Sequence, residues 1–273
     1  MSQLGTCFRQ LAAQNKKALI PFVTAGDPDP GFTVELMHEL VTAGADIIEL
    51  GVPFSDPMAD GPVIQAADER ALKHHVSLTD VVSMVSEFRR QDKSTPIVLM
   101  GYLNPVEILG YERFSDLAEA AGVDGILIVD MPPEEAGEFS PLMREKQIDV
   151  IYLVSPTTNA ERIKLINDQA SGYLYYVSLK GVTGASTLDV NAVAEKIDEI
   201  KTISTLPIGV GFGIKDGQTA QAVAKIADAV IVGSALVKQV ELGRQDYQKI
   251  KNRISGILRE MRSMMDTGNG SIE

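Results

Sequence analysis

Eight short apolar runs, rich in Val and Ile, alternate with stretches of helical periodicity along this chain. Continuous apolar runs are typical of parallel strands that are covered on both faces. The runs are residues 18–25, 46–52, 97–102, 125–130, 150–155, 173–178, 207–213 and 229–234. Eight β/α units in strict alternation predict an α/β fold, a single-domain (β/α)8 TIM barrel. An open doubly wound sheet is the alternative, although eight units exceed what most such sheets need.

The spacers between the runs carry the periodicity and the start signals of helices. Apolar residues recur on one helical stripe at Val193, Ile197 and Ile200, and again at Phe114, Leu117, Ala118 and Ala121. Two helix starts are marked by Pro132-Pro133 ahead of Glu134-Glu135 and by Thr158-Asn159 ahead of residues 160–167.

Length and composition fit one such barrel. The 273 residues compare with roughly 250 for a typical barrel, so residues 1–265 form the predicted catalytic domain. The polar, Gly-rich residues 266–273 are expected to form a flexible C-terminal tail. A net charge of −12 argues against nucleic acid as a partner. A single cysteine (Cys7), no run of about 18 apolar residues and no N-terminal signal pattern together predict a cytoplasmic globular protein.

Glu49 is the most unusual residue in the apolar runs. Strand alternation points Ile47, Glu49 and Gly51 to one side of the second run. A carboxylate inside such a strand is costly unless it is paired or used. A buried ion pair is the structural alternative, but the neighbouring runs 18–25 and 97–102 contain no Lys or Arg. The pattern therefore favours a functional Glu49 whose pKa is raised by desolvation.

Two loops follow strand ends, where barrel enzymes keep their active sites. Residues 55–62 carry Asp56 and Asp60 in a Pro/Gly-rich path, and residues 179–189 are rich in Gly, Ser and Thr. Asp56 fits a turn former. Asp60 shares the second strand exit with Glu49, and two carboxylates in different environments can divide acid and base roles.

A metal site is the competing use of these acids. Glu49, Asp56, Asp60 and Asp130 could supply oxygen ligands. The three histidines His38, His74 and His75 lie in helical stretches away from the strand ends, so no histidine ligand is expected.

Glycine clusters at three successive strand ends indicate a phosphate site. They are residues 181–184, 209–214 and 233–235. Barrels often bind phosphate with the loops after strands seven and eight and a helix N-terminus, where N–H groups reach the anion. Glycines needed only for tight turns are the alternative. Six apolar or aromatic side chains lie near the same strand ends: Phe22, Met100, Tyr102, Leu127, Tyr175 and Phe212. Each one alone is compatible with a place in the core. Arranged together in a ring, they would suit a flat apolar group of a ligand.

At these positions the sequence resembles the tryptophan synthase α subunit family. The matching stretches are residues 21–28, 49–62, 181–184, 211–214 and 233–235, within a similarity that runs from about Phe8 to about Met261. The resemblance implies retro-aldol cleavage of indole-3-glycerol phosphate to indole and glyceraldehyde 3-phosphate, with no cofactor in this chain. Lys180 follows Leu179 where some members have another basic residue, which leaves the behaviour of that loop open.

The resemblance also implies a role for each matching residue. Glu49 is the expected general acid–base, and Asp60 is expected to accept the indole N–H and stabilise the indolenine cation. The expected phosphate contacts are Gly184, Gly213, Gly233 and Ser234. The expected substrate pocket is Phe22, Met100, Leu127, Tyr175, Thr183 and Phe212, with Thr183 approaching Asp60 from the loop 179–189.

A partner is implied as well. Family members dock on a pyridoxal-phosphate β subunit that receives indole through an internal tunnel, in an expected α2β2 heterotetramer. Residues 55–62 and Asn104-Pro105 match the docking surface. Two other hypotheses compete. A sugar-phosphate isomerase or aldolase usually needs a catalytic Lys, His or metal on a strand, and the eight runs contain no Lys or His. A non-catalytic subunit that only activates a β subunit would not need Glu49 and Asp60.

Overall fold

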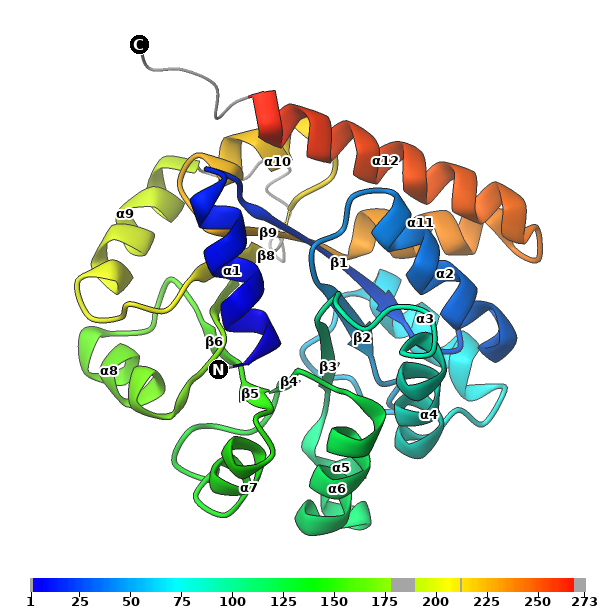
Figure 1. The fold of residues 1–273 in the computed structure, drawn as a ribbon, viewed down its shortest axis with the longest axis horizontal. Coiled ribbons are helices and arrows are strands. Elements are labelled where there is room, and N and C mark those ends of the chain that lie inside the picture. Colours follow the sequence, from blue (N-terminus) through cyan, green and yellow to red (C-terminus); the bar gives the residue numbers. More distant parts are fainter. Residues whose placement is uncertain (1, 178–189, 212, 268–273) are drawn as a thin grey trace.

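The computed structural model contains a parallel β-barrel surrounded by helices (Figure 1). It describes residues 2–177, 190–211 and 213–267. The strands are β1 (Ala18–Thr24), β2 (Ile48–Gly51), β3 (Ile97–Gly101), β4 (Gly125–Ile128), β5 (Asp149–Val150), β6 (Tyr152–Val154), β7 (Leu174–Val177), β8 (Ile208–Gly211) and β9 (Ala229–Val232). Their order in the sheet is β5-β4-β3-β2-β1-β9-β8-β7-β6.

The sheet closes on itself through the fifth apolar run. β5 and β6 stand at the two ends of the strand order, yet only Ile151 separates them along the chain. The Ile151 N–H donates to the Ile126 carbonyl at 2.9 Å, so pairing with β4 continues through the break. The predicted barrel of eight β/α units is therefore confirmed, and the open sheet is excluded.

Twelve helices lie within the described residues. They are α1 (Gln3–Ala13), α2 (Pro30–Thr42), α3 (Pro62–Leu72), α4 (Leu78–Phe88), α5 (Leu103–Leu109), α6 (Tyr111–Ala121), α7 (Phe139–Glu145), α8 (Ala160–Gln169), α9 (Val190–Lys201), α10 (Gly217–Ala224), α11 (Ser234–Gly243) and α12 (Tyr247–Thr267). The apolar stripes predicted for α6 and α9 face the sheet, since Phe114, Ala118, Val193, Ile197 and Ile200 are buried.

The observed helix ends agree with the sequence predictions in one case and differ in another. Asn159 caps α8 as predicted, with its side chain accepting from the Arg162 N–H at 2.9 Å. The start at Glu134 is wrong, because residues 133–138 form turns and α7 begins at Phe139. Gly137 lies in that stretch, and glycine favours turns over a helix interior. At the C-terminus, α12 continues to Thr267, and Arg262 pairs with Asp266 one turn along at 2.6 Å.

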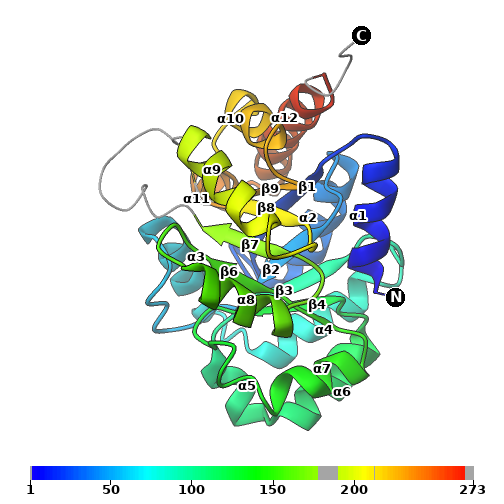
Figure 2. The same ribbon diagram turned by 90° about the vertical axis from the view of Figure 1, so that its left-hand side faces the viewer.

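Two apolar layers surround the strands. The larger layer lies between strands and helices and includes Ile48 and Leu50, whereas Ile47 packs inside the barrel. The alternation predicted around Glu49 is thus confirmed, and Glu49 belongs to the inward-facing set. α1 closes the end of the barrel where the strands begin, because Leu4 and Phe8 pack into the inner layer. Figure 2 shows α1 and α3 on opposite sides of the strands.

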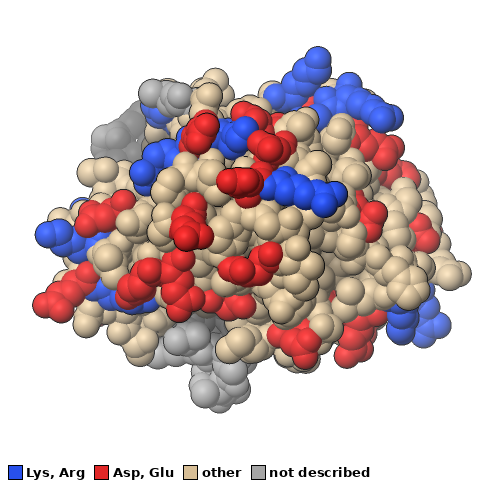
Figure 3. Space-filling model, turned by 90° about the horizontal axis from the view of Figure 1, so that it is seen from below, with Lys and Arg blue, Asp and Glu red and all other residues tan. Residues whose placement is uncertain are grey.

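The outer surface is acidic and contains no spanning segment among the described helices. Figure 3 shows acidic side chains spread over one face, with basic ones mostly toward its edge, in keeping with the net charge of −12. No helix of the described residues is long and apolar enough to cross a membrane.

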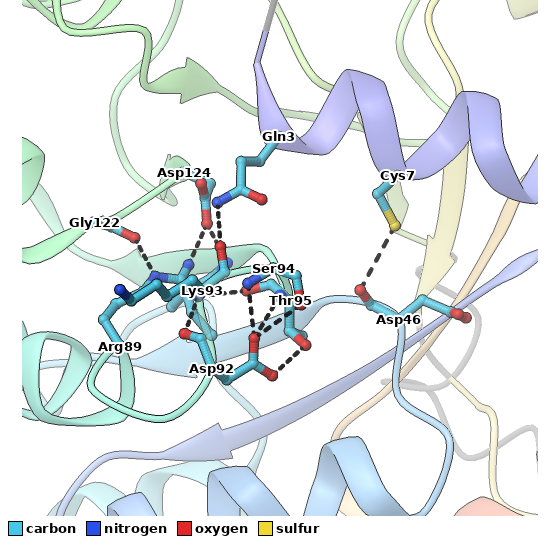
Figure 4. A network of polar contacts seen from close by, with 11 residues as sticks. Gln3, Cys7, Asp46, Arg89, Asp92, Lys93, Ser94, Thr95, Gly122 and Asp124 are labelled. Atoms are coloured by element: carbon cyan, nitrogen blue, oxygen red, sulfur yellow. Dashed lines mark hydrogen bonds and ion pairs between the residues drawn. The ribbon is translucent and has the colours of Figure 1, made fainter.

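The rim at the strand starts, here called the lower rim, is fastened by paired charges (Figure 4). Arg89 donates to Asp124 at 2.5 Å and to the carbonyls of Gly122 and Thr95 at 2.9 and 2.8 Å. Asp124 in turn accepts the Ile97 N–H at 2.8 Å. These bonds tie α4 to the starts of β3 and β4, so the acids of this rim serve the fold.

Candidate active site

A cavity of about 490 Å³ opens at the other rim, where the strands end. This upper rim is where barrel enzymes place their chemistry, and the volume suits a small organic ligand. Seven residues singled out from the sequence line it: Phe22, Asp60, Met100, Tyr175, Gly213, Gly233 and Ser234. The sequence analysis therefore identified residues from six different strand ends that the fold brings to one place.

Glu49 lies beneath this cavity and has no exposed surface. On β2 it stands between Phe22 of β1 and Val98 of β3 in the sheet register. Its Oε1 accepts a hydrogen bond from the Tyr173 hydroxyl, while its Oε2 is buried without a partner in the described structure. Burial raises the pKa of Glu49 to about 7, and the Tyr173 hydrogen bond opposes part of that shift. Such a carboxyl can both give and take a proton near neutral pH.

Asp60 lies on the loop that precedes α3. Its Oδ2 accepts from the Tyr102 hydroxyl at 2.8 Å, and that hydroxyl accepts from the Ala59 N–H at 3.0 Å. Burial raises the pKa of Asp60, and the Tyr102 hydrogen bond lowers it. The side chain is thus fixed at the cavity wall by a neutral donor.

Tyr175 connects the two carboxylates. Both Glu49 and Asp60 act on its phenol, and together with burial they raise its pKa well above the usual value. Its ring occupies space beside β8 that only glycine leaves free, because a Cβ at Gly211 would lie 2.1 Å from the Tyr175 oxygen. Tyr175 lines the cavity together with Asp60, and Glu49 lies close enough to act on the same phenol from the barrel interior.

Some of the apolar residues predicted for the substrate pocket lie in the cavity wall, and others do not. The Phe22 ring packs over Gly51, where an added Cβ would approach it to 2.6 Å, and it faces Gly233 on the other side. Met100 lines the cavity, whereas Leu127 is fully buried in the inner barrel layer below it. Phe212 lies outside the described residues.

The remaining wall has the form of an anion site. Gly213, two residues after the end of β8, adopts φ +76°, a conformation that glycine tolerates. Gly233 is the N-cap of α11 and Ser234 its first residue, so the free N–H groups of that helix face the cavity. Gly184 and Thr183 lie outside the described residues.

Other acids and histidines are engaged elsewhere. Asp56 accepts from the Ser55 hydroxyl at 2.5 Å, and Asp130 accepts from the Leu103 N–H at 2.8 Å. His74 contacts the Pro28 carbonyl at 3.1 Å. Within the part of the chain that the structure describes, no three His, Cys, Asp or Glu side chains form a group suited to a metal ion. Burial raises the pKa of the Cys7 thiol to about 12, so it is a thiol at neutral pH.

Three features of the site escaped the sequence analysis. Tyr173 was not identified as the partner of Glu49, although alternation from Tyr175 places it on the same inward face. Tyr102 was recognised as an aromatic residue near a strand end but not as the donor to Asp60. Asp68 on α3 is only 5% exposed and lines a small cavity beside Asp60, and no sequence signal distinguishes it from a surface acid.

The upper rim of this closed barrel combines a cavity, an exposed helix N-terminus and two carboxylates that have no cationic partner among the described residues. These features define an acid–base enzyme of the (β/α)8-barrel class. Comparison with known sequences gives the family. A profile described as tryptophan synthase alpha chain matches residues 8–266. The chain belongs to the tryptophan synthase alpha chain family.

Relatives match over nearly the whole chain. The tryptophan synthase alpha chain of Thioalkalivibrio sulfidiphilus is 59% identical over 266 residues, covering 97% of this chain and 100% of the relative. That of Methylococcus capsulatus is 57% identical with the same coverage. The crystal structure of tryptophan synthase subunit alpha from Legionella pneumophila superposes with a TM-score of 0.92 at 46% identity, covering 98% of this chain and 99% of that one.

The family defines the reaction. Its members are carbon–carbon lyases of tryptophan biosynthesis that cleave indole-3-glycerol phosphate to indole and glyceraldehyde 3-phosphate, and this chain is such a lyase. The sequence-based prediction of family, fold and reaction is therefore confirmed. The isomerase or aldolase hypothesis is excluded.

Proposed function

We propose that Glu49 and Asp60 carry the cleavage in this chain. Glu49 donates a proton to indole C3 and then takes the proton of the adjacent glycerol hydroxyl, so one proton enters and one leaves. The C–C bond breaks as that hydroxyl becomes the aldehyde of glyceraldehyde 3-phosphate, and its electron pair restores the indole ring. Asp60 accepts the indole N–H and faces the positive charge of the indolenine.

The single observation that supports these roles best is the contrast between the two acids. Glu49 has a pKa of about 7, so both its protonated and ionised forms are populated at neutral pH. Asp60 lies at the cavity wall, where burial raises its pKa and the Tyr102 donor opposes that shift in favour of the ionised form. A proton carrier and a fixed counter-charge are the two groups that this reaction needs.

The phosphate of the substrate is proposed to bind at Gly213, Gly233 and Ser234, together with Gly184 of the undescribed loop. The N-terminus of α11 supports this assignment, because its N–H groups and its dipole both favour an anion. Phe22, Met100 and Tyr175 would then contact the indole ring, with Thr183 and Phe212 as further proposed contacts. Leu127 would act from below by supporting the wall.

A cofactor-free reaction and a β-subunit partner complete the proposal. Proton transfer and charge stabilisation by Glu49 and Asp60 need no cofactor, so pyridoxal phosphate belongs to the partner. Met58, within the predicted docking segment 55–62, is 84% exposed, and Ile108, shortly after the segment 104–105, is 81% exposed. Exposed apolar side chains of this kind suit a protein interface, and the proposed assembly is an α2β2 heterotetramer in the cytoplasm. The acidic surface supports neither nucleic acid nor membrane as a partner.

The direct test is to mix the purified chain with indole-3-glycerol phosphate and measure indole. Asp60→Asn keeps the volume of the side chain but removes its charge, so kcat should fall about 10²-fold. Asp56→Asn is the matched control, because Asp56 lies on the same loop and is exposed. Equal losses in both variants would show that the loop, and not the Asp60 charge, matters.

The phosphate assignment has its own test. Gly233→Ala should raise KM more than it lowers kcat, because the added methyl group would lie against the Phe22 ring at the cavity wall, beside the backbone that the anion would approach. A change confined to kcat would contradict the proposed phosphate position.

A further inference from the structure

Asp68 is a buried acid that the proposed mechanism does not use. It lies on α3, two turns after Asp60, and is only 5% exposed. A helix residue so deeply buried is normally apolar or paired with a cation. The charged groups that act most strongly on Asp68 are two carboxylates, Asp60 and Asp27.

The surroundings of Asp68 favour its neutral form. Arg70 on the same helix is engaged by Asp27, with its Nε 2.7 Å from Asp27 Oδ1. Two donors act in the opposite direction. The Phe54 N–H and the Thr24 hydroxyl both lower the pKa of Asp68 and so favour its anion, although the Thr24 oxygen has no hydrogen bond of normal geometry. Burial and the neighbouring charge of Asp60 outweigh both donors.

A small cavity joins Asp68 to the active site. It measures about 10 Å³, room for about one water, and both Asp60 and Asp68 line it. Phe22, Met100 and Tyr102 line the same space, and Phe22 and Met100 also line the substrate cavity. A proton on Asp68 can therefore be donated toward the anionic Asp60 through a single bridging molecule, whereas two anions across this space would repel each other.

We propose that Asp68 is a positioning residue for Asp60, acting as the neutral member of a carboxyl pair that holds one proton and keeps the Asp60 anion at the cavity wall. This inference rests on the proposed role of Asp60. Tyr102, which donates to Asp60 from the end of β3, also faces the pair, and it remains protonated because burial and Asp60 raise its pKa. Tyr175 lies near Asp60 as well, and its pKa is raised well above the usual value, so it is neutral too.

The pair has a predicted pH dependence. Burial and Asp60 raise the pKa of Asp68 to about 8. Above that pH the second negative charge would push Asp60 away from its place, and kcat/KM would fall. Asn at position 68 is neutral at every pH and copies the shape of the protonated acid.

The test compares kcat/KM of the wild type and Asp68→Asn between about pH 6.5 and pH 9. The ratio of kcat/KM in the variant to kcat/KM in the wild type should stay near one at the lower pH. It should rise at least about threefold as the pH passes 8. This is less than the tenfold change that a free-energy difference of about 1.4 kcal/mol would produce. Titration of Glu49 occurs in both proteins and cancels in the ratio. A ratio that does not change with pH, or one that falls as pH rises, would overturn the proposal.

A second measurement does not depend on activity. Infrared difference spectra of the full chain in the Glu49→Gln background should show a protonated carboxyl band at pH 7 that disappears with a midpoint near 8 and is absent from Glu49→Gln/Asp68→Asn. Asp124→Asn is the matched control, since Asp124 is equally buried at the lower rim and should not alter that band. No protonated band assignable to Asp68 would refute the proposal. Full activity of Asp60→Asn would instead refute the proposed role of Asp60 and leave the infrared result to decide the protonation of Asp68.

Discussion

Both rims of this barrel contain buried acidic residues, but the acids of the two rims have different roles. At the lower rim Asp124 is paired with Arg89 and caps the Ile97 N–H, and Asp46 is likewise 2.9 Å from Arg262 and accepts the Leu19 N–H at 2.8 Å. At the upper rim Glu49 and Asp60 have tyrosine hydroxyls as their side-chain donors.

The two sets of acids differ in the donor that each carboxylate faces, and Glu49 is also the most deeply buried of them. All of these acids are at least partly buried. A guanidinium neutralises the charge of the carboxylate that it pairs with. A neutral phenol does not, so the charge of that carboxyl group remains available to a substrate and its proton can still be exchanged. Residues of the lower rim should therefore govern stability with little effect on turnover. Residues of the upper rim should govern turnover, and their removal should cost little stability or even increase it.

The sharpest contrast is expected for Glu49→Gln. Loss of proton transfer should lower kcat by about 10³-fold or more, because a positioned acid–base group contributes about 10²–10⁴-fold and here serves two steps. The fold should be retained, since Gln has nearly the same volume. Turnover and circular dichroism measure the two effects. Substantial turnover in a folded variant would contradict the role of Glu49.

Arg89→Met should produce the reverse pattern. Asp124 would remain buried without its cation, which costs about 3–5 kcal/mol of the free energy of unfolding. Urea unfolding measures this loss, and kcat at a temperature where the variant is folded should stay within about twofold of wild type. Arg259→Met is the control, because Arg259 is 62% exposed and 3.9 Å from Glu39, so its removal should change stability little. A loss of turnover in folded Arg89→Met would end the division between the rims.

The pH dependence of the free energy of unfolding tests whether the upper-rim acid Glu49 reduces stability at neutral pH. Its pKa rises from 4.5 to about 7 on folding, so the folded chain keeps a proton that the unfolded chain releases. The stability that Glu49 contributes is complete below pH 4.5 and is lost as pH rises through 7. Glu49→Gln should therefore gain up to about 3 kcal/mol relative to wild type between about pH 4.5 and pH 8, since each pKa unit is worth about 1.4 kcal/mol. Parallel stability curves of the two proteins would show that the pKa of Glu49 is not raised.

The sequence predicted the strands, the closed barrel and seven residues of the cavity wall, because these follow from local patterns. Alternation within one strand was enough to turn Glu49 inward, and glycines at strand ends marked Gly213 and Gly233. The interruption at Ile151 depends on how the neighbouring strands fit, which no local pattern reports, whereas the late start of α7 has a local signal in Gly137.

Contacts across the barrel were the main omission. Tyr173 and Glu49 are separated by 124 residues, and the barrel alone determines that they meet. Leu127 is an apolar residue near a strand end, like the residues of the wall, yet it is fully buried in the inner barrel layer and is not part of the cavity lining. Asp68 carries no signal at all, because an acid on a helix is normally solvated.

Tyr173→Phe is expected to have the smallest effect and is the most direct probe of the phenol partner. The change removes one hydroxyl and keeps the ring, which packs 5.8 Å from Phe8. Glu49 Oε2 already lacks a partner, so the variant leaves both carboxylate oxygens without one. Because the lost hydrogen bond favoured the anion, the pKa of Glu49 should rise further, and stability should fall by about 1–2 kcal/mol above pH 7 but by less near pH 5.

Tyr176→Phe is the matched control for this variant. Tyr176 is equally buried on the same strand but faces the helix layer, so its removal should affect stability similarly at both pH values. Unfolding in urea at about pH 5 and pH 8 gives the comparison for both variants. If Tyr173→Phe and Tyr176→Phe lost the same stability at both pH values, the Tyr173 hydroxyl would not be stabilising a carboxylate. The upper rim would then hold Glu49 by burial alone, and the contrast between phenol and guanidinium partners would not explain how the two rims differ.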